Sequence, residues 1–237
     1  MGNWRVGLGL AWLVLIVACR AAAPAAPVAP PLPYVEHVTQ GANADRALPL
    51  LIVLHGLGDS PEGILPLFAE LAPATRIIAP RAPDPWGEGG SWYPLAESSA
   101  TRIAERAALV AQLIAHVRAQ RPTRGKAIVT GFSQGGVLSF ALAARHAAAI
   151  AGAVPIAGAL PRELELDSPA APLKVRAFHG EADARILYAD AERTLARLRE
   201  AGFDATLTGF AGVGHEVSAD MERQIHAQLS ALLSAQR

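Results

Sequence analysis

The chain has 237 residues, with 21 Lys plus Arg and 21 Asp plus Glu, so its formal net charge at pH 7 is zero. This length is sufficient for one domain of about 200 residues with a substantial core, after an N-terminal leader. The charge balance argues against nucleic acid as a partner and against an acidic disordered tail. The 51% hydrophobic content is raised by alanine and by the leader, so it does not indicate an integral membrane protein.

Residues 1–18 have the pattern of a secretory signal peptide. An uncharged apolar run, residues 6–18, follows Arg5 and is too short for a comfortable transmembrane helix. The run ends in Leu-Ile-Val-Ala-Cys, which resembles the bacterial lipobox, so we expect Cys19 to carry a lipid and to become the mature N-terminus. The alternative is an ordinary signal peptide, or a short anchor helix, with an incidental cysteine. Because Cys19 is the only cysteine, an internal disulfide is excluded.

Residues 19–33 form an Ala/Pro-rich segment after the cysteine. Repeated prolines favour an extended conformation that cannot build a core, so we interpret this segment as a semi-rigid tether. We expect one globular domain over residues 34–237. The leader predicts a membrane-anchored lipoprotein of the bacterial cell envelope that faces the periplasm or the exterior, with secretion as the alternative.

From residue 34 onward, strand and helix patterns alternate. Apolar strands are predicted at 34–39, 48–54, 76–79, 127–130, 150–156, 173–178 and 204–210. Helices are predicted at 61–71, 98–121, 186–201, directly after Ser133, and from about 217 to 235. Residues 80–95, rich in Pro, Gly and Trp, are expected to form a long functional loop. Alternation of this kind predicts an α/β fold with a mostly parallel central sheet and helices on both faces.

Residues 131–135, Gly-Phe-Ser-Gln-Gly, fit the G-x-S-x-G pattern of a nucleophile elbow. A strand is predicted before this turn and a helix after it, which is the context that the pattern requires. Small residues are needed on either side of Ser133 because the strand and helix backbones crowd there. The helix N-terminus also favours negative charge that develops beside the serine.

Polar clusters follow the ends of several predicted strands, where ligands bind in open parallel sheets. Ser133, Asp183 and His215 occur in the chain order of α/β-hydrolase nucleophile, acid and base. A serine needs such a base, and the base needs a third group to orient it. Competing candidates are Glu181, Asp167 and Asp204 for the acid, and His226 and His146 for the base.

Two backbone N–H groups are expected to form an oxyanion hole: that of Gln134, directly after the serine, and that of Leu57, in the loop after the 48–54 strand. Gly56 and Gly58 would keep this loop close to Ser133. His55 and Asp59 are expected to fix the loop rather than to react.

These motifs together resemble the phospholipase/carboxylesterase family, which includes acyl-protein thioesterases. The matching segments are 54–59 (Leu-His-Gly-Leu-Gly-Asp), 131–136, 179–183 (His-Gly-Glu-Ala-Asp) and 214–218 (Gly-His-Glu-Val-Ser), and the match extends over about 48–236. The resemblance implies a capless α/β-hydrolase with the triad Ser133, Asp183 and His215, which hydrolyses carboxylic or thioester bonds without a metal or an organic cofactor. It also includes Trp92 and Tyr93, which could line a substrate pocket or could simply pack the loop.

The sequence departs from the family pattern in two places. Pro94 stands where the family usually has Asp, and Arg185 and Ile186 follow Asp183 where many members have two small apolar residues. An envelope location disfavours an intracellular acyl-protein substrate, so a carboxylesterase is the preferred interpretation. A lysophospholipase, a polysaccharide acetyl or feruloyl esterase, or a peptidase with the same triad remains open. A non-catalytic binding module on the envelope is the alternative from a different class.

Overall fold

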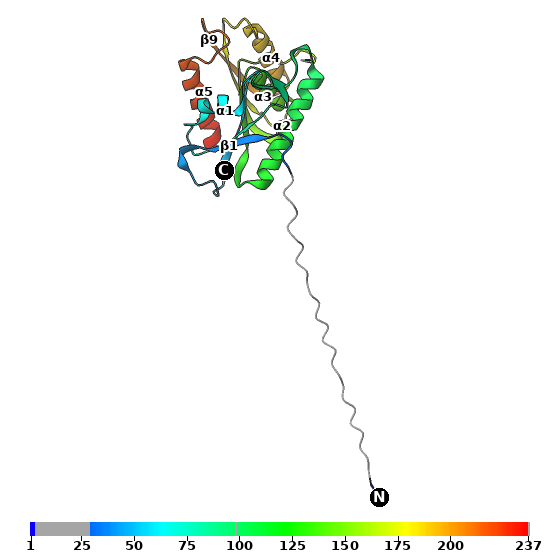
Figure 1. The fold of residues 1–237 in the computed structure, drawn as a ribbon. Coiled ribbons are helices and arrows are strands. Elements are labelled where there is room, and N and C mark those ends of the chain that lie inside the picture. The colour runs from blue at the N-terminus through cyan, green and yellow to red at the C-terminus, as the bar shows by residue number, and fades with distance from the viewer. Residues whose placement is uncertain (3–28, 98, 237) are drawn as a thin grey trace.

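The computed structural model describes residues 1–2, 29–97 and 99–236 (Figure 1). Cys19, the predicted signal peptide beyond its first two residues and most of the predicted tether therefore lie outside the described residues. The end of the predicted tether belongs to the folded domain, because Leu32 is buried and the Pro33 carbonyl accepts a hydrogen bond from the Arg81 N–H. The domain thus begins slightly before residue 34.

A seven-stranded sheet forms the centre of the domain, in the order β1-β3-β2-β6-β7-β8-β9. Only β1 is antiparallel to its neighbour, β3, and the other pairs are parallel, as the sequence predicts. The strands are β1 (Tyr34–Val38), β2 (Leu48–Leu54), β3 (Arg76–Pro80), β6 (Thr123–Phe132), β7 (Ile150–Ile156), β8 (Lys174–Gly180) and β9 (Asp204–Phe210).

Helices cover both faces of this sheet (Figure 1). On one face lie α2 (Ala100–Gln120), α3 (Gln134–Arg145) and α4 (Tyr188–Glu200), and on the other α1 (Pro61–Ile64) and α5 (Ala219–Ser234). Strand β2 is buried on both sides: Leu50, Ile52 and Leu54 pack into the first core, and Leu51 and Val53 into the second. This explains its uninterrupted apolar run. The described residues also include four 3₁₀ turns: Thr39–Gly41, Leu65–Phe68, Leu95–Glu97 and Ala147–Ala149.

The helix predicted over residues 61–71 is shorter than expected. The Ser60 side chain caps its start by accepting from the Gly63 N–H at 3.2 Å, but α1 ends at Ile64 and a 3₁₀ turn follows. Pro66 explains the change, because it has no N–H to donate to the carbonyl four residues earlier. Ile64, Phe68 and Leu71 are nevertheless buried as the pattern predicts.

The predicted long loop 80–95 contains a hairpin of β4 (Asp84–Trp86) and β5 (Gly89–Ser91). Gly87, at the turn, has a φ of 57°, which favours glycine. The hairpin lies against the loop after β2: the Gly58 N–H donates to the Gly90 carbonyl at 2.8 Å, and the Gly90 N–H to the Asp59 carbonyl at 2.9 Å. It therefore supports the candidate site.

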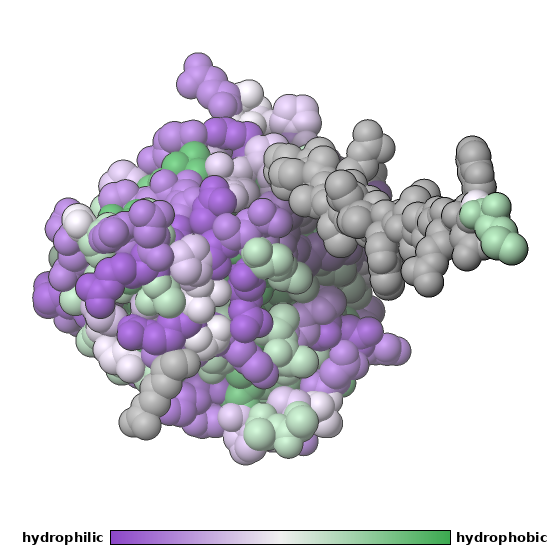
Figure 2. Space-filling model, turned by 90° about the horizontal axis from the view of Figure 1, so that it is seen from below, coloured by the Kyte–Doolittle hydropathy of each residue, from purple (hydrophilic) through white to green (hydrophobic). Residues whose placement is uncertain are grey.

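Figure 2 shows one face of the molecule, on which hydrophilic residues predominate and hydrophobic ones are interspersed among them. Among the residues that the structure describes, no helix has both the length and the apolar character needed to cross a membrane.

Candidate active site

Ser133 occupies the turn between β6 and α3 in a strained conformation, with φ 56° and ψ −117°. Non-glycine residues rarely adopt positive φ, so surrounding contacts must hold it there. The Ser133 N–H donates to the Ile156 carbonyl at 3.0 Å, and the Ser133 carbonyl accepts from the Val137 N–H at 2.9 Å. The turn thus directs the side chain away from the sheet and toward the loops at its carboxyl edge.

Three glycines allow this turn to form. A Cβ atom on Gly131 would lie 2.6 Å from the Leu54 carbonyl oxygen, and one on Gly135 only 2.0 Å from that atom. A Cβ on Gly136 would lie 2.3 Å from the Ile156 carbonyl oxygen. Because the obstructing atoms are backbone, they cannot move aside cheaply. The small residues of the G-x-S-x-G pattern are therefore required by close packing.

The structure brings Ser133, His215 and Asp183 together from the ends of three strands. His215 Nε2 lies 2.9 Å from Ser133 Oγ, and His215 Nδ1 lies 2.7 Å from Asp183 Oδ2. Since a carboxylate only accepts, Nδ1 carries the proton and Nε2 is free to accept the serine proton. The Phe132 ring packs against the imidazole with a centroid distance of 4.9 Å. This geometry suits a nucleophile, a base and an orienting acid.

Asp183 is buried, and each of its oxygens has partners. Oδ1 accepts from the N–H groups of Arg185 at 2.8 Å and Ile186 at 3.0 Å, while Oδ2 accepts from His215. Nε2 of His179 lies 3.2 Å from Oδ2 and 2.8 Å from the Ile186 carbonyl oxygen, so it holds this turn. Burial by itself raises the pKa of Asp183, but these hydrogen bonds outweigh it and hold the pKa below its ordinary value. The carboxylate stays charged beside the base.

The competing candidates lie elsewhere. Asp167 and Asp204 form ion pairs with Arg145 and Arg176, and Glu181 is exposed. His226 Nε2 lies 2.6 Å from the Leu67 carbonyl oxygen, and His146 follows the last turn of α3.

The backbone N–H groups of Leu57 and Gln134 both belong to residues that line a cavity of about 610 Å³ at Ser133. Within the part of the chain that the structure describes, neither N–H has a hydrogen-bond acceptor. Free donors beside a nucleophile can stabilise a developing oxyanion. Among the described residues, no three His, Cys, Asp or Glu side chains are grouped so that they could hold a metal ion.

His55 holds the Leu57 loop from the interior. Its Nδ1 lies 2.7 Å from the Gly56 carbonyl oxygen, and its Nε2 accepts from the Ala82 N–H at 3.1 Å. Since a carbonyl only accepts, Nδ1 carries the proton and the ring is neutral. Burial lowers the pKa of His55, which preserves this state. His55 therefore has a structural role, in agreement with the sequence-based expectation.

Trp92 does not line the cavity, contrary to the expectation for this pair of aromatic residues. It is fully buried, and its indole Nε1–H donates to the His55 carbonyl at 2.9 Å, so it supports the Leu57 loop. Tyr93 does line the cavity. The two neighbouring side chains therefore have different surroundings, although they are adjacent in the sequence.

Several contacts and lining residues of the site were not identified from the sequence. The Gln134 side chain accepts from the Trp92 N–H and donates to the Tyr93 carbonyl, each at 2.9 Å, which joins the elbow to the segment after the hairpin. Arg185, Ile186 and Leu95 line the cavity. The Gly-Glu-Gly-Gly run at 87–90 is a hairpin signal that could have indicated β4 and β5. No local signal marks the contacts of Gln134.

Comparison with known proteins gives a consistent result. The profile of the phospholipase/carboxylesterase family matches residues 36–233. A curated relative from Nocardia uniformis subsp. tsuyamanensis, named "Putative esterase NocK", is 30% identical over 156 residues, which are 63% of this chain and 44% of the relative. The chain thus spans less than half the length of this relative.

Solved structures share the fold. Esterase PE8 has a TM-score of 0.67 at 24% identity, covering 85% of this chain and 98% of that protein. The Bacillus cereus carboxylesterase has a TM-score of 0.70 at 20% identity, covering 85% of this chain and 94% of that protein. At these identities the likeness concerns the capless α/β-hydrolase architecture alone.

Proposed function

The chain belongs to the phospholipase/carboxylesterase family, and we propose that it is a serine hydrolase that cleaves carboxylic esters through an acyl-enzyme on Ser133. The observation that carries the proposal is the hydrogen-bonded series from Ser133 Oγ to His215 to Asp183, over 2.9 Å and 2.7 Å. It lies at a cavity whose lining also includes Leu57 and Gln134, the two residues whose backbone N–H groups have no acceptor among the described residues.

Acylation begins when Ser133 Oγ attacks the ester carbonyl and His215 Nε2 takes the hydroxyl proton. The carbonyl oxygen gains negative charge, which the Leu57 and Gln134 N–H groups stabilise. Losing one such donor costs on the order of 3 kcal/mol in the barrier. His215 then donates its proton to the leaving alcohol, and the acyl group remains on Ser133.

Deacylation uses the same groups. A water molecule attacks the acyl-enzyme while His215 accepts its proton, and the acid product leaves as Ser133 regains its hydrogen. Asp183 stabilises the imidazolium in both steps, and its lowered pKa keeps it charged.

Two measurements test this assignment. Ser133→Ala should reduce kcat for p-nitrophenyl butyrate by on the order of 10⁶-fold while the protein stays folded. A fluorophosphonate should label the wild-type protein at Ser133 and leave Ser133→Ala unlabelled. Retained turnover in the variant, or labelling at another residue, would show that Ser133 is not the nucleophile. Folded wild-type protein that neither reacts nor turns over ester would instead favour a binding module.

We also propose that the protein is a lipoprotein anchored through Cys19 in the bacterial envelope, with the domain displayed on a short Ala/Pro-rich tether. Support comes from the uncharged apolar run before Cys19 and from the lipobox resemblance at residues 15–19. Mass spectrometry of the N-terminal peptide from membranes is the test. A diacylglyceryl group on Cys19 is expected, and an unmodified Cys19 would rule out the anchor.

A further inference from the structure

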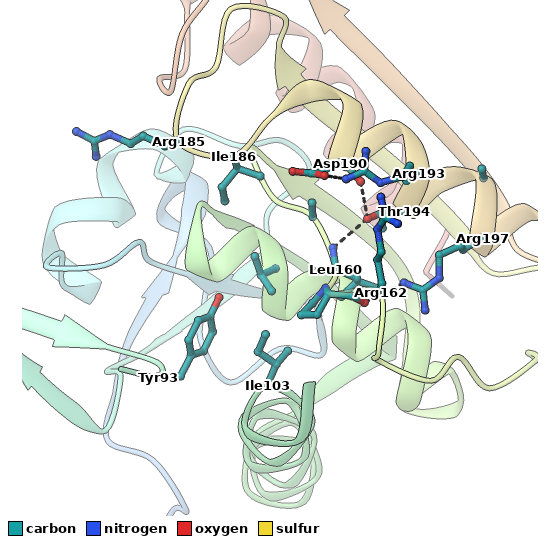
Figure 3. A pocket seen from close by; sticks show the side chains of 14 residues that line it. Tyr93, Ile103, Leu160, Arg162, Arg185, Ile186, Asp190, Arg193, Thr194 and Arg197 are labelled. Carbon is teal, nitrogen blue, oxygen red and sulfur yellow. Dashed lines mark hydrogen bonds and ion pairs between the residues drawn. The ribbon is translucent and has the colours of Figure 1, made fainter. Parts of the chain in front are cut away.

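A second cavity, of about 700 Å³, adjoins the candidate active site (Figure 3). Three residues, Tyr93, Arg185 and Ile186, line both this cavity and the one at Ser133. The two cavities therefore meet at these three residues, which lie between Ser133 and the second space.

The second cavity carries an excess of positive charge. Its lining contains four arginines, Arg162, Arg185, Arg193 and Arg197, and one acid, Asp190. Four positive charges against one negative leave a local surplus of three in a chain whose formal net charge is zero. Asp190 pairs with Arg193. In the described part of the chain, the other three arginines have no carboxylate partner.

Two segments form this wall and are held together by hydrogen bonds. Arg197 of α4 donates to the Pro161 carbonyl at 2.9 Å, which fixes its guanidinium without neutralising its charge. The Thr194 hydroxyl donates to the Asp190 carbonyl and accepts from the Leu160 N–H, each at 2.9 Å. Figure 3 shows Arg162, Arg193 and Arg197 together at one end of the cavity, with Tyr93 and Arg185 toward the other.

A hydroxyl donor lies at the junction of the two cavities. Figure 3 shows the Tyr93 hydroxyl directed toward the space, and it has no hydrogen-bond partner among the residues described. Burial raises the pKa of Tyr93, so this hydroxyl stays protonated and able to donate. Apolar side chains, among them Ile103, Val137 and Leu160, also line this cavity.

We propose that this arginine-lined cavity binds an anionic group of the substrate, a carboxylate or a phosphate, several atoms away from the ester that Ser133 attacks. The inference rests on the proposed esterase function and names the substrate class: acidic esters. Guanidinium groups present several donors in a plane that matches carboxylate and phosphate oxygens. A surplus of positive charge in a concave wall also raises the local concentration of anions. The apolar part of the lining accommodates the carbon chain in between.

Two pairs of substrates test the proposal. Mono-4-nitrophenyl adipate is compared with 4-nitrophenyl hexanoate, which has the same acyl length without the terminal carboxylate. The acetyl ester of 4-hydroxybutyl phosphate is compared with butyl acetate, which places the anion on the alcohol side. In at least one pair we expect kcat/KM to be about 10-fold or more higher for the anionic member at low salt. The pair that responds identifies the side of the ester that occupies the cavity. Equal or lower values for both anionic members would overturn the proposal.

Variants locate the effect. Arg162→Gln and Arg193→Gln should each lower the anionic-to-neutral ratio of kcat/KM by several-fold. The matched control is Arg223→Gln, because Arg223 pairs with Asp220 on α5 in the same i, i+3 arrangement as Arg193 with Asp190, outside the cavity. The anionic-to-neutral ratio of kcat/KM in Arg223→Gln should equal that of the wild type. A ratio that does not change in the cavity variants, or that falls equally in Arg223→Gln, contradicts the proposal.

The two proposals fail separately. If neutral esters are hydrolysed by the wild type but not by Ser133→Ala, and no anionic preference appears, then the esterase assignment holds and the anion site does not exist. If Ser133→Ala retains hydrolysis, then the esterase assignment is wrong, and the substrate class deduced from it fails too.

Discussion

Arg185 donates its backbone N–H to the carboxylate of Asp183 at 2.8 Å, while its side chain lines both the cavity at Ser133 and the arginine-lined cavity. Ile186 has the same dual position, with its N–H 3.0 Å from Asp183 Oδ1. One short turn thus orients the proposed acid and forms the boundary between the cavities. Because the backbone makes the bonds to Asp183, side-chain changes here can alter substrate preference without removing them.

Replacing the proposed acid tests the role of Asp183. The side-chain amide of Asp183→Asn can donate a hydrogen bond to His215 Nδ1, which the carboxylate cannot. The His215 tautomer whose Nε2 is free to accept is then no longer favoured, so we expect kcat to fall by about 10⁴-fold. The measurement is steady-state turnover of p-nitrophenyl butyrate, with circular dichroism to verify folding. Glu181→Gln is the control, since Glu181 is exposed two residues away, and its kcat should match the wild type. A larger loss of kcat in Glu181→Gln than in Asp183→Asn would identify Glu181 as the acid.

The pH dependence of stability should reveal His55. Because burial lowers its pKa in the folded state, the unfolded chain, with an ordinary value of about 6.5, binds a proton that the folded chain does not. The free energy of unfolding should therefore fall as pH decreases below about 6.5 toward the folded-state pKa. Urea unfolding at pH 7.5, 6.5 and 5.5 measures this slope. The His55→Gln variant has no titrating group at this position, so its free energy of unfolding should depend less steeply on pH. Identical slopes in the two proteins would mean that His55 does not cause the pH dependence.

Gly135 should tolerate no side chain. Gly135→Ala would place a Cβ atom 2.0 Å from the Leu54 carbonyl oxygen and 2.9 Å from that of His55, so we expect a loss of about 3 kcal/mol or more in the free energy of unfolding. Gly214→Ala is the matched control, because nothing lies within 4 Å of the added atom. It should change stability by less than about 1 kcal/mol. Similar losses in both variants would mean that crowding at the elbow is not the cause.

The Gln134 side chain should stabilise the segment that carries Tyr93. Gln134→Leu keeps the backbone N–H but leaves the buried Trp92 N–H without its acceptor, so we expect a cost of about 1–3 kcal/mol and a lower kcat/KM. Gln228→Leu provides the comparison, because the buried Gln228 Oε1 has no hydrogen-bond partner among the described residues. That variant should be neutral or stabilising. If Gln134→Leu is equally neutral, the hydrogen bonds to residues 92 and 93 do not support the site.

Several features of the fold followed from local patterns. Strands 48–54 and 150–156 have the predicted bounds, because apolar runs between turn residues report burial directly. The predicted bounds were wrong where a single residue changes the local backbone. Pro66 shortens α1, and Gly87 permits a hairpin inside a segment that resembles a loop. Each exception was visible in the sequence, but its consequence depended on neighbouring contacts.

The sequence by itself determined the α/β fold and the candidates Ser133, Asp183 and His215, because strand order and the elbow pattern place polar residues at one edge of a parallel sheet. Only the tertiary structure decided that Trp92 supports the interior while Tyr93 lines the cavity. It alone revealed the arginine-lined cavity as well, since α4 and the loop 157–173 are brought together by folding. The periodicity of apolar residues reports which face of its own helix or strand each residue occupies. A cavity, in contrast, depends on side chains that converge from distant segments.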